Sequence, residues 1–318
     1  QKDMHLLRPY LQAKPSDFRF DAFLDDYEPA APKEYEFLQA LTEAMEEADA
    51  AQMAEALLHH YKAYGRGDMA RYMAFYLLPS GELKGIETFR HREWDDLIGY
   101  AVQKEKLLRN TVNFIEGRQA NNVLLTGARG TGKSTAVKAL VYKFHKEGLR
   151  LVQVERGQMK KLPPLMEHLS AIKSKKFILF FDDLSFDEDE KEYKYLKSVI
   201  DGGIIPQPDN VVIYATSNRR HLLKETWRDR RDDLDEVYRD DSQNESISLS
   251  DRFGLIIHYA APTQDEYLQI IDHELRKAGV ALEAHELRIL GLRWEMEHSG
   301  RNGRIARQFV RWYLGNQT

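Results

Sequence analysis

The stretch NNVLLTGARGTGKS, residues 121–134, joins a short apolar run to the complete pattern G-x-x-x-x-G-K-[ST]. Residues 122–126 predict a buried strand, and residues 134–145 predict a helix after the loop. Glycines let the backbone curl, so that successive N–H groups form a nest for an anion at the helix N-terminus. An ordinary glycine turn is the alternative, but the position between strand and helix favours a phosphate-binding loop.

This loop supplies most of the residues that we expect to hold a nucleotide. Lys133 is expected to reach the β- and γ-phosphates and to take part in catalysis, and the Ser134 hydroxyl is expected to bind magnesium. The loop therefore predicts a nucleoside triphosphate with Mg²⁺, and the family resemblance described below implies that the nucleotide is ATP. The predicted contacts in the loop are Gly127, Ala128, Arg129, Gly130, Thr131, Gly132, Lys133, Ser134 and Thr135.

A second strand brings acidic residues to the same site. Residues 177–181 are five consecutive apolar residues, and Asp182 and Asp183 follow them directly. Ligands bind at the carboxyl ends of strands in open α/β sheets. We therefore expect Asp182 to bind magnesium and Asp183 to orient or deprotonate the attacking water. The alternative is that both acids only cap the following turn.

The rest of the chain indicates how this unit is embedded. Further strands are expected at residues 151–154, 211–215 and 254–259, and helices separate them, as in a parallel α/β sheet flanked by helices. Helical spacing after Pro262, at residues 267–277, 284–298 and 303–314, predicts a helical lid.

The N-terminal part has a different pattern. Residues 1–32 contain four prolines and are interpreted as an extended arm, whereas the apolar spacing from Lys33 to about Leu78 predicts helices, with a boundary at Asp49. The predicted domains are an N-terminal arm and helical domain (1–88), an α/β nucleotide-binding core (89–261) and the lid (262–318).

Composition narrows the function classes. The 318 residues contain no cysteine, which excludes disulfides, cysteine-based metal sites and thiol nucleophiles. The formal net charge of −5 argues against a wholly basic nucleic-acid coat protein. No apolar run approaches membrane-spanning length, and Gln1 to Tyr10 lack the apolar stretch of a signal peptide, so we expect a soluble, cytoplasmic protein. Residues 226–246, dense in charge, are interpreted as a solvated insertion or a partner-docking loop.

The two motifs resemble Walker A and Walker B of AAA+ ATPases. The sequence also resembles the bacterial AAA+ family numbered eight-fifteen among domains of unknown function. Four segments carry this resemblance: NNVLLTGARGTGKS, FDDLSF, YATSNRRH and SLSDRFG. The likeness covers about Trp94 to Phe309. It implies an AAA+ core with a lid, and relatives among helicase-loader and initiator-type proteins.

The resemblance also implies roles for residues outside the two motifs. Asn218 matches the sensor-1 position that aligns water against the γ-phosphate. Arg252 matches an arginine finger presented to a neighbouring subunit, which implies a homo-oligomer. Arg304 matches the sensor-2 arginine of the lid, and Ile98 lies in the segment 94–99 that packs near adenine.

Each of these roles has an alternative. Asn218 could cap a helix at residues 219–223, and Arg252 could form a structural ion pair. Arg301 and Arg307 compete with Arg304 for the lid position.

One departure from the AAA+ pattern bears on activity. Most AAA+ hydrolases carry Glu after the metal-binding Asp, whereas this chain has the shorter Asp183. We therefore expect a slow Mg²⁺-dependent ATPase, with Lys133, Asp183, Asn218 and Arg252 as catalytic residues, that remodels or loads an unknown macromolecular client in an oligomer. The alternatives are a nucleotide-regulated adaptor and a helicase-loader-like protein that binds nucleic acid. Nucleic acid is not favoured, because of the net charge, and no membrane partner is expected.

Overall fold

The computed structural model of the chain describes residues 49–64, 67–185, 191–200, 207–218, 252–298 and 300–316. The chain divides into two compact units between Arg71 and Tyr72. The predicted arm, the predicted helical residues 33–48 and the charged segment 226–246 lie outside the described residues. The domain bounds 1–88, 89–261 and 262–318 stay predictions.

The described part of the first unit consists of two helices, α3 (Ala50–Tyr64) and α4 (Asp68–Arg71). Asp49 lies directly before α3, at the expected helix boundary. Its carboxylate accepts hydrogen bonds from the N–H groups of Ala51 and Gln52, at 2.8 and 2.9 Å, and the Gln52 side chain accepts from the Asp49 N–H. This reciprocal pair satisfies amides that the first turn of a helix leaves without partners.

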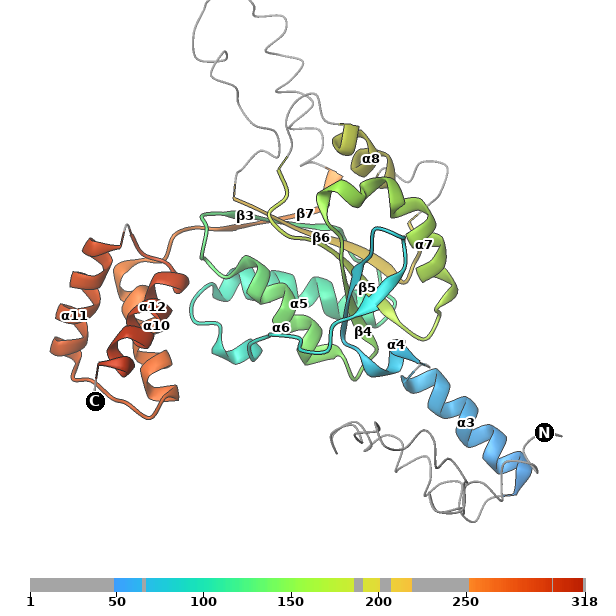
Figure 1. Cartoon of the computed structure of the whole chain (residues 1–318), viewed down its shortest axis with the longest axis horizontal. Coiled ribbons are helices and arrows are strands. Elements are labelled where there is room, and N and C mark those ends of the chain that lie inside the picture. Colours follow the sequence, from blue (N-terminus) through green and yellow to red (C-terminus); the bar gives the residue numbers. More distant parts are fainter. Residues whose placement is uncertain are drawn as a thin grey trace, which may run out of the picture. The chain divides into compact units, whose positions relative to one another are not determined.

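The second unit is built on a sheet (Figure 1). Among the described residues, seven strands pair in the order β2-β1-β4-β5-β6-β3-β7. Every neighbouring pair is parallel except β1 and β2, which are antiparallel. The bounds are β1 Ala74–Leu77, β2 Leu83–Gly85, β3 Val123–Gly127, β4 Leu149–Gln153, β5 Lys176–Phe181, β6 Val211–Ser217 and β7 Leu255–Tyr259.

Strands β1 and β2 correct the sequence interpretation. The helical pattern was expected to continue to about Leu78, but Ala74–Leu77 is a strand that pairs with β4, with Ala74 opposite Leu151. A short apolar run fits a helix and a buried strand equally well, so periodicity could not separate them. Residues 79–81 form the turn of the β1–β2 hairpin, with Gly81 at φ 99°.

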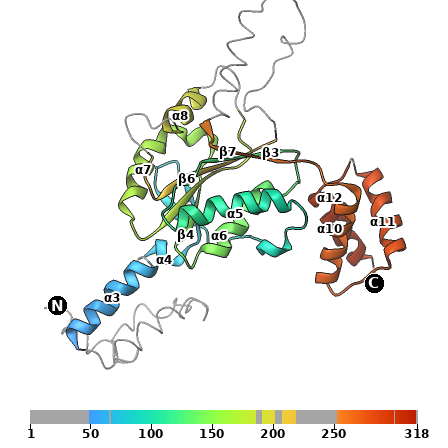
Figure 2. The same cartoon turned by 180° about the vertical axis from the view of Figure 1, so that it is seen from behind.

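Helices cover both faces of the sheet (Figures 1 and 2). On one face lie α5 (Ala101–Ile115) and α6 (Lys133–Phe144), and on the other lie α7 (Leu162–Ala171) and α8 (Lys191–Ile200). Successive residues of a strand point to opposite faces, so alternate β5 residues such as Ile178 and Phe180 join the core under α5 and α6. Two short 3₁₀ turns complete the unit, at Trp94–Asp96 and Arg156–Lys161.

The C-terminal lid is a bundle of α10 (Gln264–Lys277), α11 (Ala284–Glu297) and α12 (Gly303–Gly315). Its own buried cluster includes Tyr267, Ile271 and Phe309. Thr263 caps α10 and Asn302 caps α12, each through a side-chain oxygen that accepts from backbone N–H groups. The predicted fold class is confirmed: a largely parallel α/β core with flanking helices and a C-terminal helical lid. No helix among the described residues has both the length and the apolar character that a membrane span requires.

Candidate functional site

The loop between β3 and α6 has the curled backbone that the glycine pattern predicts. Gly127, Gly130 and Gly132 have φ values of 128°, 80° and 94°, in the region that favours glycine. A side chain at Gly127 is also excluded by space, because its Cβ would lie 1.9 Å from the Tyr259 carbonyl oxygen of β7. Thr131 closes the turn by donating its hydroxyl to the Ala128 carbonyl at 2.9 Å.

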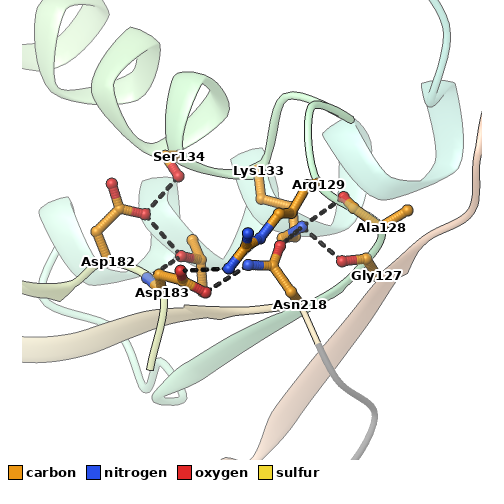
Figure 3. Close-up of polar contacts among 9 residues, drawn as sticks. Gly127, Ala128, Arg129, Lys133, Ser134, Asp182, Asp183 and Asn218 are labelled. Carbon is orange, nitrogen blue, oxygen red and sulfur yellow. Dashed lines mark hydrogen bonds and ion pairs between the residues drawn. The ribbon is translucent and has the colours of Figure 1, made fainter. Parts of the chain in front are cut away.

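Lys133 lies inside this curl (Figure 3) and is only 6% exposed. Its ammonium donates to the carbonyls of Gly127 and Ala128, at 2.7 and 2.8 Å, and to Asn218 Oδ1 at 3.2 Å. Burial lowers the pKa of Lys133, while the nearby Asp183 and Asp182 act in the opposite direction. The carbonyls of Gly127 and Ala128 thus orient the ammonium within the loop.

Asp182 follows β5 and faces the first turn of α6 (Figure 3). Its Oδ1 accepts from the hydroxyl of Ser134 at 2.5 Å and from that of Thr216 at 2.8 Å. The predicted pair Ser134 and Asp182 is therefore brought together across the 48 residues that separate them. Thr216, on β6, was not predicted. The only available signal was a hydroxyl near the end of a buried strand.

Asp183 has the left-handed φ of 58°, which Asp adopts more readily than most non-glycine residues. Its carboxylate accepts from the Asn218 amide, and Arg129 lies 3.5 Å away. Asn218 thus bridges Lys133 and Asp183 (Figure 3). The alternative helix at residues 219–223, which Asn218 would cap, lies outside the described residues.

Two clefts adjoin the loop. The phosphate-side cleft is lined by Asp182, Asp183, Thr216, Asn218, Arg304, Arg307 and the loop residues Arg129, Gly130 and 132–135. The second cleft contains Ile98, Tyr100, Thr135, Tyr259 and Arg307 among its lining residues. Ile98 thus lines the second cleft, and Thr135 lines both clefts.

The three candidate lid arginines differ in whether they line a cleft. Arg304 and Arg307 both line the phosphate-side cleft, whereas Arg301 lines neither cleft and pairs with Glu295 at 2.8 Å. Arg307 is half-buried, and burial lowers its pKa, as do the nearby Arg92 charge and other arginines. Two of the three candidate lid arginines thus face the site.

The lid is joined to the core beside the loop. Gly303 at the start of α12 donates its N–H to the Gly130 carbonyl at 3.0 Å. Ion pairs of Arg92 with Glu274 and of Asp96 with Lys277 add to this link, as does a hydrogen bond between Asp96 and His273 of α10. Although burial raises it, the bonds to Lys277 and His273 hold the pKa of Asp96 below its usual value.

Arg252 is the one predicted site residue placed away from this group. It precedes β7, and the start of β7 pairs with the start of β3, with Leu255 opposite Val123. The phosphate loop follows the other end of β3, which is four strand steps away, or about 13 Å. Arg252 lies among the residues that line neither cleft.

The side chains present fit a magnesium ion. Mg²⁺ prefers oxygen ligands and is usually held by one or two protein groups together with phosphates and waters. Ser134 Oγ and Asp182 Oδ1 are such a pair, at 2.5 Å from each other beside Lys133. In the described part of the chain, no group of three or more His, Cys, Asp or Glu side chains could hold a metal by itself. The donor set therefore suits a metal brought with a phosphate ligand.

Comparison with solved structures gives a further finding. The RuvB Holliday junction branch migration motor of Thermotoga maritima matches with 20% identity and a TM-score of 0.47, over 70% of this chain and 64% of that chain. Two substituted forms of that motor match with 19% and 20% identity and TM-scores of 0.47 and 0.46. The present chain thus spans 64% of the length of the RuvB chain. No curated protein matches it.

The sequence family is set by a match over most of the second unit. Residues 70–317 match the family model described as protein of unknown function DUF815. This range contains the phosphate loop, both acids, Asn218, Arg252 and the lid. The chain belongs to the DUF815 family, as the resemblance of its motifs had indicated.

Proposed function

We propose that this protein is an AAA+-type ATPase that binds ATP with Mg²⁺ and hydrolyses it slowly. The observation that carries the proposal is the convergence of three elements: the α6 N-terminus with Lys133 and Ser134, Asp182 after β5, and Asn218 after β6. A nucleoside triphosphate with Mg²⁺ requires an anion nest, a buried cation and a pair of oxygen ligands for the metal. These three features meet at one point here.

In this proposal each side chain has one task. The loop amides and Lys133 bind the phosphates, so the ammonium leaves the carbonyls of Gly127 and Ala128 for phosphate oxygens. Ser134 and Asp182 hold the metal, which would neutralise charge on the phosphates. Asp183 accepts a proton from the attacking water, and Asn218 orients that water. Arg304 and Arg307 face the phosphates from the lid.

Binding is tested with Lys133→Ala, because that change removes the buried cation and keeps the loop amides. Calorimetry with ATP should show loss of measurable binding in the variant. Lys138→Ala is a matched control, since this lysine belongs to the same helix and lines neither cleft. It should bind ATP like the wild type. Near-native ATP affinity in Lys133→Ala would contradict the proposal.

A second function, a nucleotide-regulated adaptor, is favoured by one observation. The Asp183 carboxylate already accepts from Asn218 and lies 3.5 Å from Arg129, so an attacking water would have to share its oxygens with these groups. In an adaptor, binding of ATP alone would order the lid, and turnover would be incidental. Single-turnover hydrolysis separates the two functions: a rate unaffected by Asp183→Asn, together with nucleotide-dependent lid closure, would favour the adaptor.

The proposal extends to assembly and to a client. Arg252 would act on ATP bound by a neighbouring copy, so the active form would be a homo-oligomer. The work would be remodelling or loading of a macromolecular client. Affinity capture with Asp183→Asn in the presence of ATP tests this, because a stalled state should retain its client while Lys133→Ala should not.

A further inference from the structure

The side chain of Thr216 has no role in the reaction proposed above. It lies on β6 between β5 and β3, and it is 2% exposed. Its neighbours in space are the two acids of the site, although 33 and 34 residues separate them from it in the chain. The buried hydroxyl of Thr216 therefore lies within hydrogen-bond reach of both acids.

The hydroxyl of Thr216 is used in both directions. It donates to Asp182 Oδ1 at 2.8 Å, and it accepts from the backbone N–H of Asp183 at 2.9 Å. A hydroxyl has one hydrogen to donate, so the bond to Asp182 leaves its lone pairs for the Asp183 amide. One small group thus contacts the carboxylate of one acid and the backbone of the next.

The backbone of Thr216 adds a third bond to the same turn. Its carbonyl accepts from the N–H of Leu184 at 2.7 Å. The turn needs such support because Asp183 has a φ of 58°, a conformation that costs a non-glycine residue free energy. Two consecutive amides, those of Asp183 and Leu184, are held against β6 by this one residue.

We propose that Thr216 is a positioning residue that sets both acids at once, by aiming the Asp182 carboxylate at the metal and by holding the Asp183 turn in its left-handed form. This inference rests on the proposed function. Some residues hydrogen-bond to a metal ligand without touching the metal. Removing such a residue typically lowers metal affinity or activity by about 10–100-fold. Thr216 donates to Asp182 Oδ1 from β6, and Ser134 donates to the same oxygen from α6.

The competing view is that Thr216 is an ordinary β-branched strand residue. The two views differ for Thr216→Val, which keeps the shape and the strand preference and removes only the hydroxyl. If Thr216 only packs, this variant should match the wild type. If it positions the acids, the Asp182 carboxylate loses a donor and the Asp183 amide loses its acceptor.

The experiment compares three variants of the full chain. Thr216→Val and Thr216→Ser test the hydroxyl, and Thr126→Val is the matched control. Thr126 is also a 2% exposed strand threonine, and its hydroxyl pairs with His258, away from the acids. Mn²⁺ affinity is measured by electron paramagnetic resonance with saturating ADP. ADP affinity without metal is measured by calorimetry in chelator, and folding is followed by thermal unfolding.

We expect Thr216→Val to weaken Mn²⁺ affinity by about 10–100-fold while metal-free ADP affinity changes less than about 2-fold. Thr216→Ser should restore Mn²⁺ affinity to within about 3-fold of the wild type, and Thr126→Val should leave it unchanged. The proposal is overturned if Thr216→Val folds and holds Mn²⁺ like the wild type, or if Thr126→Val weakens Mn²⁺ equally. Failure of the wild type to bind ADP would instead overturn the proposed function, and with it this role of Thr216.

Discussion

Asp183 shows how one residue combines backbone strain with a chemical task. Its φ of 58° turns the chain directly after β5, and its carboxylate points toward Asn218 and Arg129. Asp and Asn enter this left-handed region more readily than longer side chains. A Glu at this position would reach further but would fit the turn less well. The short acid is thus consistent with the turn that carries it.

Asp183→Asn is therefore a clean test of the carboxylate. Asn tolerates the same backbone conformation, so the turn should be kept while the proton acceptor is lost. We expect ATP affinity within about 2-fold of the wild type and hydrolysis slower by about 100-fold or more, the usual size of a general-base contribution. Phosphate release under saturating ATP measures this. Unchanged turnover would mean that Asp183 only caps the turn and that another group accepts the proton.

A second residue-scale prediction concerns Lys175, which is 2% exposed just before β5. Burial, together with the charge of Arg150, lowers the pKa of Lys175 to about 7. The unfolded chain, with a lysine pKa near 10.4, then binds more protons between about pH 7 and pH 10. The free energy of unfolding should consequently rise with pH in this window.

The measurement is denaturant unfolding of the wild type and Lys175→Met at pH 7 and pH 9. The wild type should gain roughly 2 kcal/mol more than the variant between these values. Equal changes in both proteins would show that Lys175 keeps an ordinary pKa.

At the scale of the element, the sequence predicted those parts whose local pattern has a single meaning. The strand β3, the glycine loop and α6 follow from one motif, and β5 follows from an apolar run that ends in two acids. The three lid helices were also predicted with similar bounds. What could not be predicted depends on contacts across the fold. Thr216 matters because β6 lies beside β5, and β1 is a strand because β4 offers it a partner.

The junction of α12 with the loop gives a prediction at this scale. Gly130 has φ 80°, and a Cβ there would lie 2.5 Å from Asn302 Oδ1, the cap of α12. Gly130→Ala should therefore push the start of α12 away and break the bond from the Gly303 N–H. Without nucleotide, we expect amide hydrogen exchange at Gly303 and Arg304 to become at least about 10-fold faster.

Gly132→Ala is the matched control for this junction. Its φ is 94°, so it carries similar backbone strain, but nothing lies within 4 Å of the added Cβ. Exchange at the start of α12 should stay near that of the wild type. If amide exchange at the start of α12 became equally faster in both variants, strain in the loop would be the cause. The result would then contradict a link between the loop and the lid.

For the whole molecule, the position of Arg252 predicts cooperation between copies. It precedes β7, whose start pairs with the start of β3, whereas the phosphate loop follows the other end of β3. We therefore expect its charge to act on ATP bound by a neighbouring copy. An arginine finger contributes about 10³-fold or more in rate. We expect Arg252→Ala to bind ATP normally and to lose most turnover, and Lys133→Ala to be inactive.

Mixing the two inactive variants provides the test. Some interfaces in the mixture pair an intact Arg252 with an intact Lys133, so part of the phosphate release should return. Wild-type activity should also rise with protein concentration. If Arg252→Ala alone turns over like the wild type, or if mixed assemblies form and stay inactive, the arginine has a structural role instead.

The hairpin of β1 and β2 has a mechanical consequence. The chain leaves the first unit at Arg71 and enters β1 almost at once, between the antiparallel β2 and the parallel β4. A force on the chain along β1 would act parallel to the strand, and so it would shear the hydrogen bonds to β2 and to β4. Under shear these bonds must break together, whereas under peeling they would open one by one. Since β4 pairs in turn with β5, tension reaches the strand that carries Asp182 and Asp183. The first unit is thus continuous in the chain with a strand that is paired on both sides.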